Sequence, residues 1–162
     1  MLAQLALLLM LVETVAGLRW TAPADWKNQG STSMRAATYS VAPNTDCVVY
    51  FFGEGQGGSV DANIERWKGQ FKTTDGRPAP AQIAKRTSHG LTITTIDTSG
   101  EYSGMGGPMS AGTAVVSGYR LLGAIVQGPH GNVFIKFTGP AKAVSANQAK
   151  FEQLIASFQP AG

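Results

Sequence analysis

The sequence has little charge, one cysteine and two histidines among its 162 residues. Charged residues make up 14% of the chain, which is well below the roughly one quarter that is usual for globular proteins. The single cysteine, Cys47, excludes an intramolecular disulfide. The net charge is only +3, and Lys and Arg form no stripe, so we expect no nucleic-acid partner.

No apolar run reaches the roughly 20 residues that a membrane-spanning helix needs. Leu5 to Val12 form a shorter apolar block, and Val15-Ala16-Gly17 places small residues where a signal peptidase cleaves. The sequence therefore predicts a signal peptide at 1–17 and a single domain at 18–162. Two features are irregular: no Lys or Arg precedes the block, and Glu13 follows it. The alternative is a short buried or membrane-attached N-terminal helix.

The predicted signal peptide sets the expected location. We expect an exported protein, periplasmic or extracellular, with no stable membrane span after the signal is removed. One domain of this length is large enough to bury a real hydrophobic core.

After the predicted signal peptide, segments with the apolar spacing of strands alternate with segments that have the apolar spacing of helices. Alternating or continuous apolar runs predict strands at 34–41, 47–52, 91–102, 118–129 and 132–139. A stripe at helical spacing predicts a helix over 60–71, and a Ser145–Gln148 capping box predicts the start of a second helix. The order predicts an α+β fold with a mostly antiparallel sheet flanked by helices.

The glycine-rich turn before the first helix has the G-x-G-x-x-G spacing of a dinucleotide-binding turn, through Gly53, Gly55 and Gly58. That motif also needs a parallel βαβ unit and an acidic residue about 20 positions later, at a strand end. Asp75 has the distance but follows no apolar strand, and Glu54 places a negative charge where phosphates would bind. We therefore interpret the glycines as a tight connection and expect no cofactor.

No set of catalytic residues emerges from the sequence. No G-x-S-x-G elbow supports a nucleophilic serine. Asp61 and Glu65 share a helix face, but that spacing is more typical of a solvated surface than of an acid/base pair. We expect no enzyme, although a deep polar pocket with perturbed titratable groups would favour a hydrolase.

An alternative hypothesis is a periplasmic copper-handling protein. Met105 and Met109 flank a Gly-Gly-Pro loop, and thioethers can bind Cu(I). His89 or His130 would complete such a site. The competing interpretation is that these methionines simply pack over the edge of the sheet.

Four stretches carry a recognisable pattern: "MRAATYSV", "VVYFFGEGQGGSVDANIERWKGQF", "GYRLLGAIVQGP" and "FIKFTGPAKAVSANQAKFEQLIASF". They resemble a group of exported bacterial proteins of unassigned function, and their pattern is similar to the Mog1/PsbP-like fold. The resemblance covers about residues 18–159. It implies an α/β/α sandwich, and domains of this kind are typically non-enzymatic binding or accessory modules.

The leading hypothesis is thus a secreted or periplasmic, non-catalytic binding or accessory domain, whose partner is another envelope protein. Candidate partner-binding residues lie in the glycine-rich turn and the following helix: Gly55, Gly57, Gly58, Asn63 and Arg66. The 103–112 loop is a second candidate surface, since binding residues gather on loops. The alternative is that these glycines only shape the turn.

Overall fold

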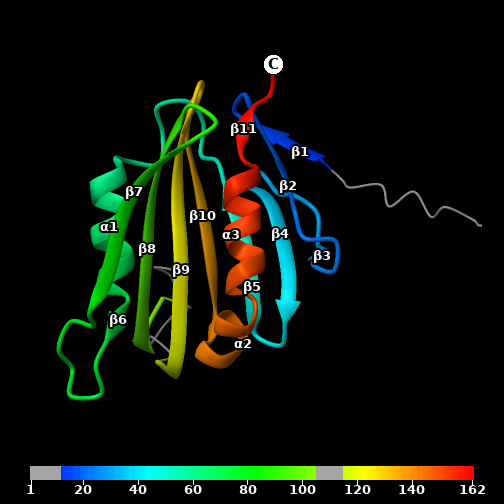
Figure 1. Ribbon diagram of the computed structural model, residues 1–162. Helices are drawn as coiled ribbons and strands as arrows, with labels where there is room; N and C mark the ends of the chain where they lie inside the picture. The colour runs from blue at the N-terminus through cyan, green and yellow to red at the C-terminus, as the bar shows by residue number, and fades with distance from the viewer. Residues whose placement is uncertain (1–11, 105–114) are drawn as a thin grey trace, which may run out of the picture.

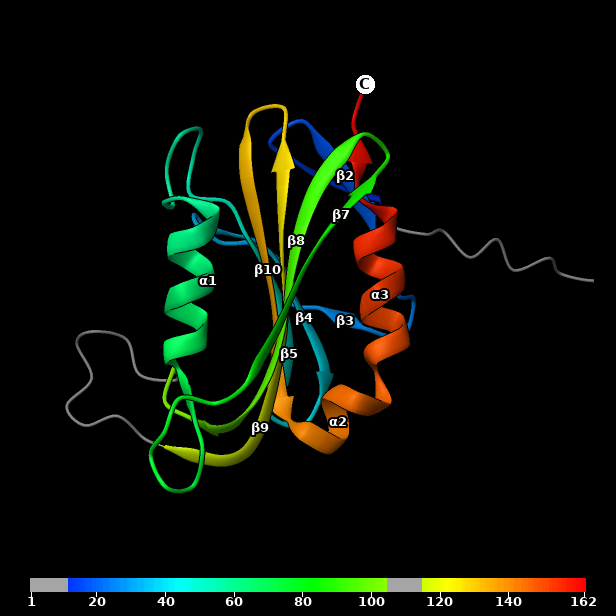
Figure 2. The same cartoon turned by 60° about the vertical axis from the view of Figure 1, so that its left-hand side comes forward.

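The computed structural model describes residues 12–104 and 115–162. Within these ranges an eight-stranded antiparallel sheet separates helix α1 from helices α2 and α3, so the domain is an α/β/α sandwich (Figures 1 and 2). This confirms the predicted fold class. The strand order is β3-β4-β5-β10-β9-β8-β6, and β7 also pairs with β8. The strands are β3 (Lys27–Asn28), β4 (Arg35–Ala42), β5 (Thr45–Tyr50), β6 (Phe71–Lys72), β7 (Ala81–Ser88), β8 (Leu91–Tyr102), β9 (Val116–Gly128) and β10 (Gly131–Pro140).

A small second sheet joins the two ends of the described chain. Its order is β1 (Val12–Val15), β2 (Leu18–Thr21) and β11 (Gln159–Pro160). Ala16 and Gly17 both have positive φ, 55° and 75°, as a two-residue type I′ hairpin turn requires. The predicted signal peptide thus overlaps β1, and cleavage after Gly17 stays a prediction.

Helix α1 (Val60–Gly69) begins and packs as the sequence predicts. The Ser59 hydroxyl accepts a hydrogen bond from the Ala62 N–H at 3.1 Å, which satisfies one of the free donors of the first turn. Ile64 and Trp67 are buried against the sheet. Trp67 lies over Gly123 of β9, where a Cβ would sit only 2.7 Å from the indole Cζ3. No helix in the described part of the chain is both long and apolar enough to span a membrane.

Two hydrophobic cores lie on opposite faces of the sheet. One packs under α1 and includes Phe71, Leu121 and Phe134; the other packs under α3. Cys47 belongs to the second core and is fully buried. Burial raises the pKa of its thiol, so Cys47 acts as a small hydrophobic side chain.

Strand β7 was not predicted from the sequence. Its residues are almost all exposed, and it pairs with β8 on one side only. The segment "AQIAKRTS" has no alternation because neither face of this edge strand contributes much to a core. The strand exists because β8 offers it a long ladder of backbone partners.

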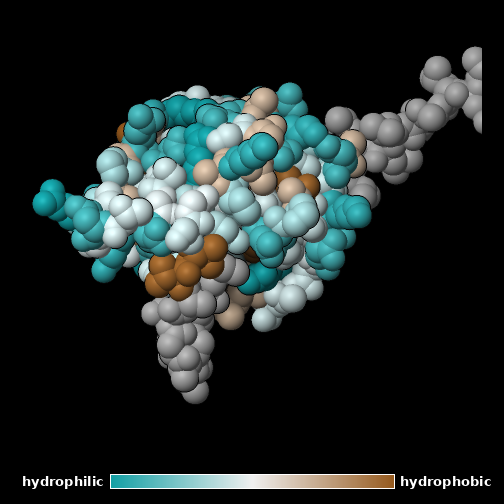
Figure 3. Space-filling view, turned by 90° about the horizontal axis from the view of Figure 1, so that it is seen from below, coloured by the Kyte–Doolittle hydropathy of each residue, from teal (hydrophilic) through white to brown (hydrophobic). Residues whose placement is uncertain are grey.

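The surface carries few exposed large hydrophobic residues. Figure 3 looks at the end of the sheet where β9 begins; most of this face is hydrophilic, with one small hydrophobic cluster. Val115, directly before β9, is 58% exposed at this end. The other exposed large hydrophobic residues among those described are Val12, Met34 and Ile83. Scattered residues of this kind are normal on a protein surface.

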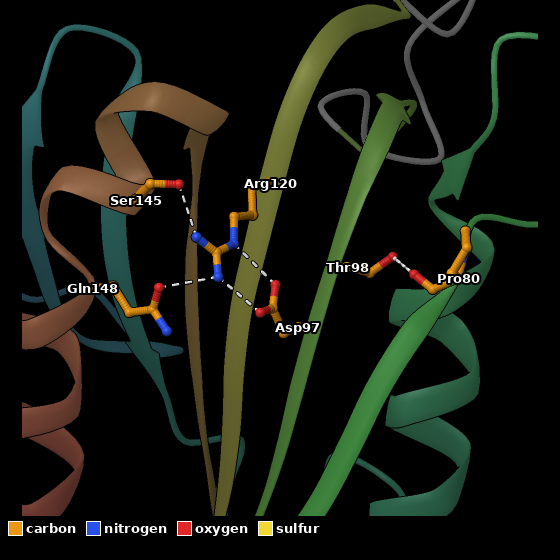
Figure 4. Close-up of polar contacts among 6 residues, drawn as sticks. All are labelled: Pro80, Asp97, Thr98, Arg120, Ser145 and Gln148. Carbon is orange, nitrogen blue, oxygen red and sulfur yellow. Dashed lines mark hydrogen bonds and ion pairs between the residues drawn. The ribbon is translucent and has the colours of Figure 1, made fainter.

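The predicted capping box is wrong. Ser145 lies inside α2 (Ala141–Ala146), and Gln148 is the first residue of α3 (Gln148–Ser157). The N-cap of α3 is Asn147, whose side chain makes no capping hydrogen bond. Ser145 and Gln148 instead accept hydrogen bonds from Arg120 at 2.8 and 3.1 Å (Figure 4). A sequence pattern for local capping is here used for a long-range contact.

Candidate binding site beside helix α1

The candidate glycines form the turn between β5 and α1. Gly55, Gly57 and Gly58 all have positive φ, 72°, 89° and 83°, which glycine adopts without steric cost. Gly57 also lies in close contact with the aromatic core: a Cβ there would be 2.7 Å from Cδ2 of Phe52 and 2.9 Å from Cε2 of Phe134. The turn therefore has a clear structural need for glycine, and a role of these residues in partner binding stays a prediction.

Asn63 joins this turn to the helix. Its side chain is buried, and its amide donates to the carbonyl oxygens of Gly57 and Ser59, each at 2.8 Å. Its Oδ1 accepts a hydrogen bond from Nη2 of Arg66 at 2.8 Å. The structure thus brings together Gly57, Asn63 and Arg66. Asn63 fixes the turn from inside, and Arg66 is exposed one turn further along α1.

A pocket lies between α1 and the strands β5 and β10. We call it the α1 pocket, and its volume is about 230 Å³. Its lining combines aromatic rings with two cations and one amide: Tyr50, Phe52, Arg66, Trp67, Gln70, Phe134 and Lys136. Of the residues predicted from the sequence, only Arg66 lines it.

Lys136 is the least ordinary residue of the α1 pocket. It stands on β10 among buried residues, and its ammonium donates to Oε1 of Gln70 at 2.8 Å and to the hydroxyl of Tyr102 at 2.9 Å. Burial, and secondly the charge of Arg66, lowers the pKa of Lys136 to about 8. Burial also raises the pKa of Tyr102 to about 12. The lysine is therefore a cation that is held in place by neutral acceptors.

The α1 pocket carries positive charge without a carboxylate to balance it. The ion pairs of residues 12–104 and 115–162 include neither Arg66 nor Lys136. Lys136 is only partly exposed, and a partly buried cation without an acidic partner is costly, so proteins seldom keep one for stability alone. The arrangement favours the binding of an anion.

The α1 pocket does not supply the groups that a hydrolase needs. Its seven lining residues include no Ser, Cys, His, Asp or Glu. Within the described residues, no three His, Cys, Asp or Glu side chains gather closely enough to hold a metal ion. Lys136, whose pKa is lowered, is therefore not enough on its own to support the hydrolase alternative.

The copper alternative receives no support. His89 and His130 are exposed in the β7–β8 and β9–β10 turns. Met105 and Met109 lie outside the described residues. The residues that flank that segment, Gly104 and Val115, are at the other end of the long β8–β9 pair from both histidines.

The fold is similar to that of a known protein at low sequence identity. The solution structure of cyanobacterial PsbP (CyanoP) from Synechocystis sp. PCC 6803 matches with a TM-score of 0.56 and 11% identity, over 98% of this chain and 96% of that one. This confirms the PsbP-like fold that the sequence pattern indicates. A protein of unknown function from Pseudomonas aeruginosa matches with a TM-score of 0.46 and 10% identity, over 91% and 94% of the two chains. No family model and no curated protein matches the sequence.

Sequence reasoning missed Lys136 and its neighbours, although one signal was present. In "FIKFTG", Phe134 and Lys136 are two residues apart and so share one face of the strand. A lysine at a core-facing position of a central strand marks a polar site inside the sheet face. Gln70 and Tyr102, which hold it, come from other elements and could not be paired with it from sequence alone.

Proposed function

We propose that this chain is an exported, non-catalytic binding or accessory domain, and that the α1 pocket is its binding site. The observation that carries the proposal is the pair of cations, Arg66 and Lys136, beside an aromatic wall with no carboxylate opposite them. The PsbP-like fold supports it, since the family resemblance implies accessory modules. The partner is a protein of the cell envelope.

The site predicted from the sequence lies next to this pocket. Arg66 belongs to both, through its hydrogen bond to Asn63 and its place in the pocket lining. We propose that the glycine-rich turn and Asn63 hold Arg66 and α1 in position, while Arg66 and Lys136 meet the ligand. In this proposal the turn positions α1, and the two cations of the pocket attract the ligand by their charge.

Capture experiments with the full chain test this proposal. Tagged wild type, a Lys136→Met/Arg66→Gln double variant and a Lys85→Met control are incubated with an envelope extract of the source organism. Lys85 is exposed on β7 and is not part of the lining of the α1 pocket, so its substitution matches the loss of a cation. A partner retained by wild type and control but lost by the double variant supports the proposal. Equal retention by all three excludes the pocket, and no retained partner contradicts the accessory role.

Export needs a separate measurement. The mass of the protein recovered from outside the cytoplasm should match a chain that begins at Leu18, if the signal peptide ends at Gly17. Recovery of the uncleaved chain from the cytoplasm alone would contradict export. A recovered chain that retains Val12–Val15 outside the cytoplasm would keep the β1–β2 hairpin and move the cleavage site upstream.

A further inference from the structure

We propose that the α1 pocket binds a carboxylate attached to a flat apolar group, the chemistry of an arylacetate. This inference rests on the proposed function and names the ligand chemistry of the same site. It follows from three properties of the pocket: the charge that is left without a partner, the aromatic wall beside that charge, and the size.

Lys136 and Arg66 each have more N–H donors than they use in hydrogen bonds to the described residues. An ammonium has three N–H donors and a guanidinium has five. Lys136 uses two, on Gln70 and Tyr102, and among the described residues its third finds no acceptor. Arg66 uses one on Asn63. Because every one of these acceptors is neutral, a carboxylate would be the first negative charge in the site, and charge-assisted hydrogen bonds are the strong kind.

An aromatic wall stands beside the cations. The rings of Tyr50 and Phe52 are stacked with centroids 5.8 Å apart, and Phe52 lies 5.6 Å from Phe134. Tyr50 and Phe52 are only half-buried, although both are large and largely apolar. A bare inorganic anion would leave these rings facing water, whereas a ligand with its own ring would cover them and gain the free energy of apolar burial.

The size of the α1 pocket limits the ligand to about one ring. A volume of about 230 Å³ equals roughly eight liquid waters and lies below the ~300–1,000 Å³ of pockets for drug-sized molecules. The walls are already in place, since Gln70 and Tyr102 hold Lys136 and since Trp67 is packed against Gly123. A preformed site loses little free energy in ordering itself around a ligand.

Binding should depend on pH through Lys136. The titratable or charged groups that face it are Arg66 of α1, Tyr102 of β8 and Tyr50 of β5, beside the amide of Gln70. The pKa of Lys136 is about 8 in the free protein, and a bound carboxylate would raise it. The affinity should therefore be nearly constant between about pH 6 and pH 7, where the lysine and the carboxylate are both charged, and should decrease as the pH rises above about 8.

Calorimetric titration of the full chain with three probes tests the inference. The probes are phenylacetate, its neutral analogue phenylacetamide, and inorganic phosphate. We expect phenylacetate to bind at least tenfold more tightly than either of the others. Lys136→Met and Arg66→Gln should each weaken it at least tenfold, whereas Lys85→Met should leave it unchanged. Arg66 is exposed, so Arg66→Gln carries the test if Lys136→Met does not fold, as judged by circular dichroism.

A fourth probe separates the two sources of such a carboxylate. N-acetylphenylalanine imitates the C-terminus of a polypeptide; if it binds more tightly than phenylacetate, the ligand is the chain end of a partner, and the reverse order indicates a free acid. Equal binding of acid and amide, phosphate binding as tight as that of phenylacetate, or unchanged binding in the variants would overturn the inference. A partner captured through the pocket without acid binding would refute only the ligand class. Acid binding without any partner would refute the accessory role and keep the ligand class.

Discussion

Arg120 of β9 donates two hydrogen bonds to the carboxylate of Asp97 on β8, at 2.9 Å to Oδ1 and 2.8 Å to Oδ2 (Figure 4). The same guanidinium reaches Ser145 and Gln148, so one side chain ties two strands of the sheet to α2 and α3. The hydrogen bonds to Asp97 raise the pKa of Arg120. The arginine is a structural tie on the face of the sheet opposite the α1 pocket.

The paired hydrogen bonds from Arg120 to Asp97 predict that lysine cannot replace this arginine. Arg120→Lys keeps the charge but cannot make the paired contact or reach both helices, so we expect the free energy of unfolding to fall by about 1–2 kcal/mol. Urea denaturation measures this. The control is Arg86→Lys, because the Arg86–Glu152 pair is more exposed, with side chains 40% and 46% accessible; its loss should cost less than about 1 kcal/mol. Equal losses in the two variants would contradict the role given to Arg120.

Gly55 and Gly57 should respond differently to alanine. Both have positive φ, so each substitution costs about 1–2 kcal/mol of backbone strain. A Cβ at Gly55 meets open space, whereas at Gly57 it meets the rings of Phe52 and Phe134. We therefore expect Gly57→Ala to lower the free energy of unfolding by at least about 1 kcal/mol more than Gly55→Ala does. Similar losses measured by denaturation would show that the contact with the rings does not matter.

The desolvated lysine predicts that stability rises with pH. The pKa of Lys136 is about 8 in the folded chain and 10.5 in the unfolded one, so between these values the unfolded chain binds more protons and the free energy of unfolding increases with pH. The free energy of unfolding of wild type minus that of Lys136→Met should increase by about 2 kcal/mol between about pH 7 and pH 9.5.

Taking the difference in the free energy of unfolding between wild type and Lys136→Met cancels the contributions of titrating groups that the substitution does not affect. Burial raises the pKa of Tyr39 and Tyr102 to about 12 and also raises that of the Cys47 thiol. Each raised pKa lowers the free energy of unfolding as the pH rises through the value in the unfolded chain, and for Tyr39 and Cys47 this happens alike in both proteins. Tyr102 contacts Lys136, but its unfolded pKa of 10.0 lies above the range of this measurement. A difference that stays flat with pH would show that Lys136 is not desolvated.

The parts of the fold that the sequence predicts are those with a strong hydrophobic period. β8, β9, β10 and α1 each bury a regular set of side chains, so their pattern is visible in one dimension. β7 was missed because its partners are backbone groups of β8 and its side chains face solvent. Ser145 and Gln148 were misinterpreted because their real partner, Arg120, is far away in the sequence.

Only part of the candidate site could be predicted from the sequence, for a similar reason. Arg66 was found through the glycine-rich turn, which is a local motif. Lys136 and Gln70 are 66 positions apart, and only the packing of α1 on β10 brings them together. A lone lysine in a strand pattern indicates an inward polar group, but its chemistry depends on neighbours that the sequence does not pair with it.

The contact between Gly123 and Trp67 predicts a substitution that acts on both the fold and the pocket. A Cβ at position 123 would lie 2.7 Å from Cζ3 of Trp67 and 2.9 Å from Cγ2 of Ile96, and both neighbours are buried. Gly123→Ala should therefore lower the free energy of unfolding by about 1–3 kcal/mol. If the indole is the obstacle, Trp67→Phe should cost less in the Gly123→Ala background than in wild type, a coupling that a double-mutant cycle measures. Because Trp67 also lines the α1 pocket, Gly123→Ala should weaken phenylacetate binding although residue 123 lies outside the lining. Additive effects in the cycle would mean that the sheet, and not the indole, yields to the new methyl group.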